Sequence, residues 1–148
     1  MHLKASRNVV MLCEGDPFFY GSFMYIFARL AKDYETIVVP GVSSITASAA
    51  AVGRPLAARN EVLKVLPATL EPERLREELA TLESAAIIKV GRHFGKVRDV
   101  LASLDLINKA IVITNATHDD ERILPAAKVE GDTLPYFTTI LVHAGGEA

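Results

Sequence analysis

The first 59 residues alternate between apolar runs and polar turns. A continuous apolar run over residues 9–13 is typical of a strand that is buried on both faces. Apolar residues then recur at the spacing of one helical face, at Phe23, Ile26, Phe27 and Leu30. A second strand is predicted over residues 35–39, and an Ala- and Ser-rich helix over residues 45–52. This strand–helix–strand–helix order predicts a parallel sheet, but two strands cannot cover their own faces.

The pattern restarts after residue 59 and is richer in elements. It predicts strands over residues 61–66, 85–90, 109–115 and 137–143, a short strand near 122–124, and helices over 71–82 and 94–104. That is enough secondary structure for a separate hydrophobic core. We therefore predict an α/β protein with a domain boundary near residues 58–60, so that residues 1–59 and 60–148 form the two domains.

Composition narrows the class of protein. Half of the 148 residues are hydrophobic and 23% are charged, which is typical of a globular chain with a core. The net charge of −2 provides no basic field for nucleic acid. The longest apolar run has six residues (23–28), far below the roughly 20 that span a bilayer. We therefore predict no nucleic-acid or membrane partner and a cytoplasmic location.

Metal and nucleophile motifs are not evident. The single cysteine, Cys13, excludes an intrachain disulfide and a Cys-based zinc cluster, and its apolar run predicts an inert core thiol. The four histidines are far apart in the sequence, and the acidic stretch 118–121 is typical of a solvated loop. Phe18, Phe19, Phe23 and Phe27 have a spacing that favours packing in a core. We predict no bound metal.

Three predicted loops follow the carboxyl ends of strands, where open α/β sheets bind ligands. The first loop spans residues 14–22 and combines glycines with carboxylates. The second spans residues 40–44, and its Ser43 and Ser44 precede a helix N-terminus with free N–H groups. The third spans residues 89–93 and brings Arg92 and His93 to the end of a buried strand. Taken singly, each loop also has an ordinary interpretation as a turn or a helix cap.

Taken in order, the loops resemble a known family. The sequence contains LCEGDPFFYGS, then VVPGVSS and GRPLAARN, and then IIKVGRH. This ordered set resembles the tetrapyrrole methylases of the cobalamin pathway and extends over nearly the whole chain. The resemblance implies a two-domain architecture, with a partial parallel-sheet domain followed by a complete mixed-sheet α/β domain. It also implies S-adenosylmethionine bound in the cleft between the domains.

The resemblance also implies roles for individual residues. It implies that the cofactor contacts Glu14, Gly15 and Asp16, where Glu14 replaces the family's commoner glycine. It further implies cofactor contacts at Ser43, Ser44, Val90 and Thr138. The substrates of this family carry many carboxylates, so Arg59, Arg92 and His93 become candidates for holding them. Tyr20 is a candidate for the catalytic base, with a packing role as the alternative.

The implied reaction transfers a methyl group to a meso carbon of a reduced tetrapyrrole such as precorrin-2. The sequence does not separate metal-free precorrin-2 from its cobalt-bearing counterpart, cobalt-factor II. The resemblance also implies a homodimer. Family members begin with a strand and a G-x-G-P-G-D loop that this sequence lacks, so we expect an incomplete cofactor site and a chain that is inactive alone. A non-catalytic α/β remnant that acts only by association stays open as an alternative.

Overall fold

The computed structural model describes residues 2–145. The chain divides into two compact units, Met1–Ser43 and Ser44–Ala148. This division falls at the start of the second long helix, so the helix predicted over residues 45–52 belongs to the larger unit. The family-type domain boundary near residue 59 is a separate matter and stays a prediction.

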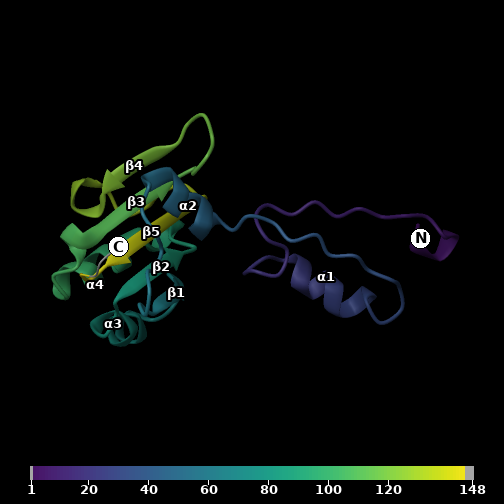
Figure 1. Cartoon of the computed structure of the whole chain (residues 1–148), viewed down its shortest axis with the longest axis horizontal. Helices are drawn as coiled ribbons and strands as arrows, with labels where there is room; N and C mark the ends of the chain where they lie inside the picture. Colours follow the sequence, from purple (N-terminus) through teal and green to yellow (C-terminus); the bar gives the residue numbers. More distant parts are fainter. Residues whose placement is uncertain (1, 146–148) are drawn as a thin grey trace. The chain divides into compact units, whose positions relative to one another are not determined.

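The smaller unit contains a short 3-10 helix, η1 (Leu3–Ala5), and one α-helix, α1 (Phe23–Leu30), as Figure 1 shows. The α1 helix confirms the helix predicted from apolar spacing. Phenylalanine rings pack beside it: Phe18 lies 4.9 Å from Phe27 and 5.8 Å from Phe23 between ring centroids. These rings do cluster, but Phe18 remains exposed and the described part of this unit has no buried residue. The predicted aromatic core is therefore only a local cluster.

The strands predicted over residues 9–13 and 35–39 do not form, and both predictions are wrong. Both runs are extended-type backbone outside any sheet, and their apolar side chains are exposed: Val10 by 82%, Leu12 by 91% and Ile37 by 84%. A strand needs a hydrogen-bonded neighbour, and the described chain supplies none at these positions. Cys13 is exposed for the same reason, which corrects its prediction as a core thiol.

The larger unit contains the elements that the second half of the sequence predicted. Its α-helices are α2 (Ser44–Val52), α3 (Pro72–Ala80) and α4 (Phe94–Ser103). Its strands are β1 (Leu63–Pro67), β2 (Ser84–Ile88), β3 (Ala110–Thr114), β4 (Arg122–Pro125) and β5 (Thr138–His143). Three 3-10 helices complete it: η2 (Gly91–His93), η3 (Ile107–Lys109) and η4 (Ala126–Lys128). The predicted element order is confirmed, with shifts of a few residues at the ends.

The five strands form one mixed sheet in the order β1-β2-β5-β3-β4. Only β1 and β2 are parallel, and the other three neighbouring pairs are antiparallel. The register pairs Thr114, the last residue of β3, with Thr138, the first residue of β5. Since β1 and β2 end at this same edge, it collects the carboxyl ends of β1, β2 and β3 and the start of β5.

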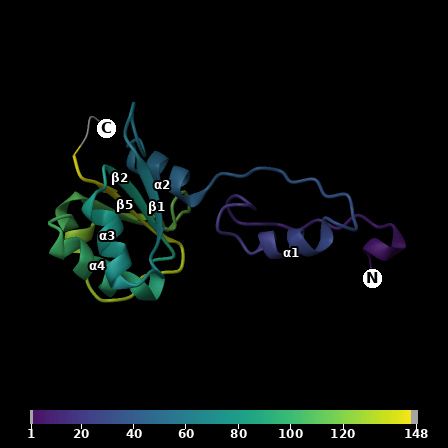
Figure 2. The ribbon, with the colours of Figure 1, turned by 90° about the horizontal axis from the view of Figure 1, so that it is seen from below.

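Helices cover both faces of the sheet (Figure 2). The main core lies on the α3 and α4 side, where Leu75, Leu79, Phe94 and Leu101 pack against Ile87 and Ile140 of the sheet. These six side chains are each at most 2% exposed. Because side chains alternate along a strand, the opposite face carries the intervening residues, including Ala86, Leu141 and His143, and α2 packs against β5 there.

The α2 face contains more polar groups than the core face. Ser84 and His143 are register partners on β2 and β5, and both are buried. The Ser84 hydroxyl donates a short hydrogen bond to the carbonyl of Leu56. Burial lowers the pKa of His143, the charge of Arg54 lowers it further, and Glu61 opposes both. His143 is thus held neutral beneath the loop that follows α2.

Candidate functional site

Two of the three predicted loops meet within the smaller unit. The Asp16 carboxylate joins them: Oδ2 accepts a hydrogen bond from the backbone N–H of Gly41, and Oδ1 accepts one from the N–H of Phe18, both at 2.9 Å. These two backbone donors, Gly41 first, lower the pKa of Asp16. The carboxylate therefore stays ionised while it fixes the loop 14–22 against the loop 40–44.

Glycines make this approach possible. A Cβ atom added to Gly41 would lie 2.2 Å from the carbonyl oxygen of Gly15, a separation that side chains do not tolerate. Gly15 itself has a φ of +74°, in the left-handed region that glycine adopts at little cost. The result is a stretch of exposed main chain without side-chain cover, and such bare backbone suits close contact with a ligand.

The remaining candidates on these loops lie near that contact in sequence. Glu14 is exposed and immediately precedes Gly15, while Tyr20 is exposed and has a φ of +55°. Ser43 is the last residue of the smaller unit, whereas Ser44 is the first residue of α2. The serine pair therefore spans the point in the sequence where the two compact units divide, and α2 begins there as predicted.

Two further candidates, Val90 and Thr138, come to one edge of the sheet in the larger unit. Val90 follows β2 and is completely buried, and Thr138 begins β5 and is 4% exposed. The Thr138 hydroxyl already donates to the carbonyl of Pro135 at 2.7 Å. Both side chains are thus committed to packing or internal hydrogen bonds. What these two positions offer a ligand is therefore backbone.

The chain returns to the start of β5 through residues 131–137. This returning segment crosses the edge of the sheet and is hydrogen-bonded to residues that follow β2 and β3. The N–H of Leu134 donates to the carbonyl of Gly91 at 3.0 Å, and the N–H of Asn115 donates to the carbonyl of Phe137 at 2.8 Å. The ends of β2 and β3 are therefore bound to the same segment. This arrangement gives the edge a defined backbone surface.

The candidate substrate-binding residues occupy two places in the larger unit. Arg92 and His93 lie in η2, and their side chains are 3.5 Å apart between Nε of Arg92 and Nε2 of His93. Partial burial lowers the pKa of His93, and the charges of Lys96 and Arg92 lower it further. Near neutral pH, His93 is therefore a hydrogen-bonding group and Arg92 is the cation of the pair. Arg59 is exposed, with a φ of +50°, in the loop between α2 and β1.

Sequence reasoning missed Asn115 and Arg122 at this edge, and it included Lys89 only as part of the loop 89–93. Lys89 and Asn115 directly follow β2 and β3, and both have left-handed backbone, with φ of +57° and +51°. Non-glycine residues in this region are uncommon and concentrate at functional sites. The signal was available: a polar residue directly after a buried strand is what marked residues 89–93. The returning segment 131–137 carried no comparable sequence signal.

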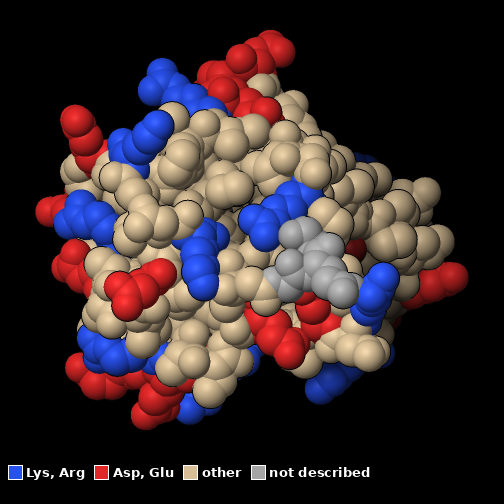
Figure 3. Space-filling model, turned by 60° about the vertical axis from the view of Figure 1, so that its left-hand side comes forward, with Lys and Arg blue, Asp and Glu red and all other residues tan. Residues whose placement is uncertain are grey.

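Neither the charged side chains on the face drawn in Figure 3 nor the metal-ligating side chains of the described residues mark out a further site. Figure 3 shows acidic and basic side chains intermixed over one face of the molecule. Among residues 2–145, three or more His, Cys, Asp or Glu side chains never gather in a group suited to a metal ion. Within the same residues, every helix is too short or too polar to cross a membrane.

These features define an α/β protein with two glycine-containing loops held in contact and a mixed sheet whose edge presents backbone groups. The chain belongs to the tetrapyrrole (corrin/porphyrin) methylases, because the model of that family matches residues 1–130. The family assignment made from the loop motifs is thereby confirmed.

Relatives with printed functions support the same family. The chain is 41% identical over 144 residues to the cobalamin biosynthesis protein CobIJ of Mycobacterium tuberculosis, covering 97% of this chain and 28% of that protein. It is 38% identical to a precorrin-2 C(20)-methyltransferase of Sinorhizobium sp, covering 95% and 58%. It is 28% identical to a cobalt-precorrin-2 C(20)-methyltransferase of Salmonella typhimurium, covering 95% and 60%. The chain thus spans from about a quarter to three fifths of the length of these relatives.

Solved structures show the same fold. The cobalt precorrin-4 methyltransferase CbiF matches with a TM-score of 0.76 at 22% identity, over 96% of this chain and 66% of that one. The methyltransferase CobJ matches with a TM-score of 0.72 at 19% identity, over 95% and 66%. These likenesses confirm the predicted α/β class and the mixed sheet of the larger unit.

Proposed function

We propose that this chain carries part of an S-adenosylmethionine-dependent C-methyltransferase that methylates carbon 20 of precorrin-2 in cobalamin biosynthesis. The observation that carries the proposal is the link from Asp16 to Gly41, which brings two glycine loops together with their backbone uncovered. Identity of 38% to a protein with that printed name supports the choice of reaction and substrate.

The residues at the paired loops fit a polar, nucleoside-bearing cofactor. Glu14 supplies an exposed carboxylate, Gly15 and Asp16 supply main chain fixed by hydrogen bonds, and Ser43 and Ser44 supply hydroxyls. We assign the cofactor to these residues and to the backbone at Val90 and Thr138. When bound, S-adenosylmethionine supplies an electrophilic methyl group on a sulfonium.

The protein's own contribution is orientation. Methyl transfer forms a carbon–carbon bond at the substrate, breaks the carbon–sulfur bond and leaves the electron pair on sulfur. Such a displacement needs the two reactants held in line, so proximity is the main catalytic effect. Arg59, Arg92 and His93 would hold substrate carboxylates. Tyr20 is the candidate to accept the proton that the methylated carbon loses.

Two alternatives from the sequence remain distinct proposals. The first is the same transfer to another corrin precursor that bears cobalt, such as cobalt-factor II. The Salmonella relative, which is named for cobalt-precorrin-2, supports a cobalt-bearing substrate. The second is a non-catalytic α/β remnant, for which the exposed apolar runs at residues 9–13 and 35–39 argue. Both alternatives retain the fold and differ in whether a cofactor binds and which substrate turns over.

Calorimetry with S-adenosylhomocysteine separates enzyme from remnant. The proposal expects micromolar binding by the wild-type chain, and silence at millimolar ligand supports the remnant. Turnover of methyl-labelled S-adenosylmethionine with precorrin-2 or its cobalt-bearing counterpart, measured on a form of the protein that includes the family's G-x-G-P-G-D loop, then separates the substrates. Label that enters only the cobalt-bearing compound would replace precorrin-2 as the proposed substrate.

The homodimer also belongs to this proposal. Apolar side chains exposed on the smaller unit, among them Leu12 and Ile37, favour association because burial removes their surface from water. Sedimentation equilibrium tests this, with twice the chain mass as the expected result. The cytoplasmic location stays a prediction.

A further inference from the structure

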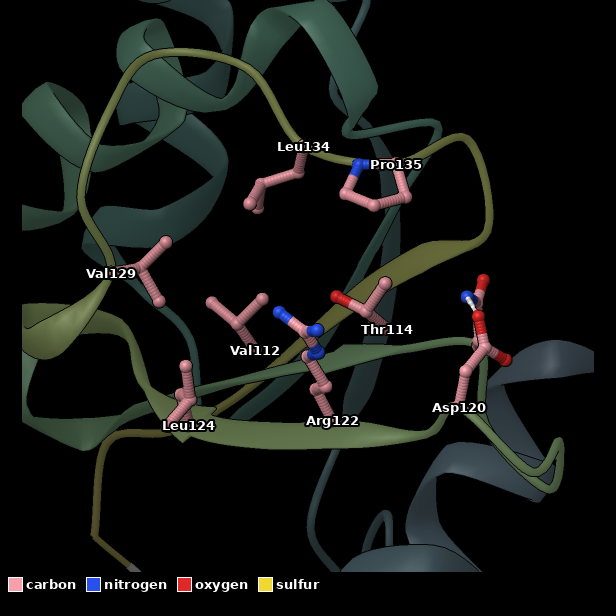
Figure 4. Close-up of a pocket in the computed structure, with 9 residues that line it drawn as sticks. Val112, Thr114, Asp120, Arg122, Leu124, Val129, Leu134 and Pro135 are labelled. Carbon is pink, nitrogen blue, oxygen red and sulfur yellow. Dashed lines mark hydrogen bonds between the residues drawn. The ribbon is translucent and has the colours of Figure 1, made fainter.

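A pocket of about 330 Å³ lies in the larger unit between the β3–β4 hairpin and the returning segment. Figure 4 shows Val112 and Leu124 on the strands, with Val129, Leu134 and Pro135 around the rim. Thr114, Asn115, Asp120 and Arg122 provide the polar groups of its lining. None of the residues proposed above for the cofactor or the substrate lines the pocket.

Arg122 is the distinctive group in this pocket. It begins β4 in register with Thr114, and its side chain points into the pocket from the hairpin (Figure 4). Among the described residues, its guanidinium has no hydrogen bond or ion pair. The nearby carboxylate of Asp120 is already engaged, since its Oδ2 accepts from Nδ2 of Asn115 at 2.6 Å. An unpaired guanidinium beside apolar walls suits an anionic group on a short hydrocarbon arm.

The pocket wall is held in place from outside. Arg98 on α4 donates to the carbonyl of Gly131 and to the carboxylate of Asp132, both at 2.7 Å. The N–H of Leu134 donates to Gly91, as described above. These three hydrogen bonds hold residues 131–134 in place without a ligand, so less conformational entropy is lost on binding.

Three aromatic rings belong to residues that are close in the sequence to residues lining the pocket. His118 and Phe137 are nearly parallel, with 13° between their planes and 6.4 Å between their centroids. Tyr136 meets Phe137 edge-on at 5.0 Å and is 84% exposed. The backbone bond from Asn115 to Phe137 ties this ring cluster to the pocket. Exposed rings of this kind suit a flat conjugated ligand.

We propose that this pocket receives a carboxylate-bearing arm of the tetrapyrrole, with Arg122 as its counter-ion and the ring cluster His118, Tyr136 and Phe137 beside the macrocycle. The inference rests on the proposed function for the identity of the ligand class. A carboxylate on a two- or three-carbon arm matches the combination of apolar wall and single guanidinium. Arg122 is thereby a substrate-binding residue that orients the ring and contributes no chemistry.

The test uses the full chain and uroporphyrin, a stable tetrapyrrole with eight carboxylates, followed by its fluorescence. Arg122→Ala is expected to weaken binding by about tenfold or more, because a paired guanidinium is lost. Arg122→Lys keeps the positive charge but loses the planar set of N–H donors. Its affinity for uroporphyrin is expected to lie between those of the wild type and Arg122→Ala. Leu124→Trp fills the pocket while keeping Arg122, and it is also expected to weaken binding. Arg76→Ala, on exposed α3 surface, is the matched control and should bind as the wild type does.

The outcomes separate this inference from the proposed function. The pocket assignment is overturned if Arg122→Ala and Leu124→Trp bind uroporphyrin with wild-type affinity. It is also overturned if the wild-type chain does not bind uroporphyrin at all. Equal weakening by Arg76→Ala and Arg122→Ala also overturns it, since it would reveal nonspecific charge attraction. Binding that depends on Arg122 without any binding of S-adenosylhomocysteine would support the pocket and contradict the methyltransferase. The reverse pattern would leave the methyltransferase standing and remove the pocket.

Discussion

Asp16 and Gly41 are 25 residues apart in the sequence, yet the Asp16 carboxylate accepts the Gly41 N–H at 2.9 Å. The same carboxylate accepts the Phe18 N–H, so one side chain closes its own turn and holds a second loop. The pKa of Asp16 is lowered as a result, which means that the ionised form is the one that stabilises the loop pair. The proposed cofactor surface depends on this single carboxylate.

We predict that Asp16→Ala weakens S-adenosylhomocysteine binding by about tenfold or more, because both charge-assisted hydrogen bonds are lost. Calorimetry measures this loss. Asp33→Asn, an exposed acidic position after α1, is the control for the change in charge and should leave affinity unaltered. Wild-type affinity in Asp16→Ala would mean that the loops hold each other without the carboxylate.

Gly41→Ala should disrupt the same surface by a different route. Its new Cβ would lie 2.2 Å from the Gly15 carbonyl oxygen, and that oxygen belongs to backbone, which cannot turn aside as a flexible side chain does. We expect the loops to separate, with lower ligand affinity and faster amide exchange at Phe18 and Gly41. Val42→Ala on the same loop alters only an exposed side chain and should behave as wild type. Slow exchange in Gly41→Ala would contradict the close approach.

The sequence predicted the larger unit well because local and tertiary signals agree there. Residues 85–88 are apolar throughout, and β2 is buried along its whole length between two helical layers. Residues 9–13 carry the same apolar signal but form no strand. Apolar character predicts burial only where a partner exists, and strand pairing is a non-local property that a five-residue run does not encode. The lack of a pairing partner therefore explains why no strand forms at residues 9–13 or 35–39 and why Cys13 is exposed.

The candidate site was predictable only in part. Glycine and carboxylate at residues 15 and 16 indicated a ligand loop, but their contact with Gly41 depends on chain geometry. Val90 and Thr138 were reached through the family resemblance, and the register explains why they share an edge. Arg122 was missed because an isolated arginine on an edge strand has no sequence signature. Its environment comes from Leu134 and Val129, which arrive from a later segment.

Arg98→Ala is predicted to loosen the returning segment. Its guanidinium contacts Gly131 and Asp132, and only backbone bonds such as Leu134 to Gly91 would remain. We expect several-fold faster hydrogen exchange at the Leu134 N–H, measured by NMR or mass spectrometry. Arg76→Ala serves again as the control for loss of an exposed arginine. Unchanged exchange at Leu134 would show that the backbone bonds alone fix the pocket wall.

His143 should make stability depend on pH. Burial first, and then the charge of Arg54, lower its pKa in the folded chain from the ordinary 6.5, so the unfolded chain binds the proton more tightly. The contribution of His143 to the free energy of unfolding should therefore be constant above pH 6.5 and fall as the pH drops below it, and His93, whose pKa is also lowered, should add to that fall. For one proton the slope is at most about 1.4 kcal/mol per pH unit. Urea unfolding at several pH values between 7.5 and 5 measures it.

His143→Gln tests that assignment through the slope, since the stability of the variant at one pH also reflects changed packing. Glutamine does not titrate, so the fall below pH 6.5 should become shallower even if the variant is less stable throughout. His93→Gln should also make the slope shallower, because burial first and then the charges of Lys96 and Arg92 lower the pKa of His93. The Nε2 atom of His143 has no hydrogen-bond partner among the described residues, so protonation there would bury an unpaired charge. A slope that persists in His143→Gln would place the titrating group elsewhere and leave the α2 face without a role in acid sensitivity.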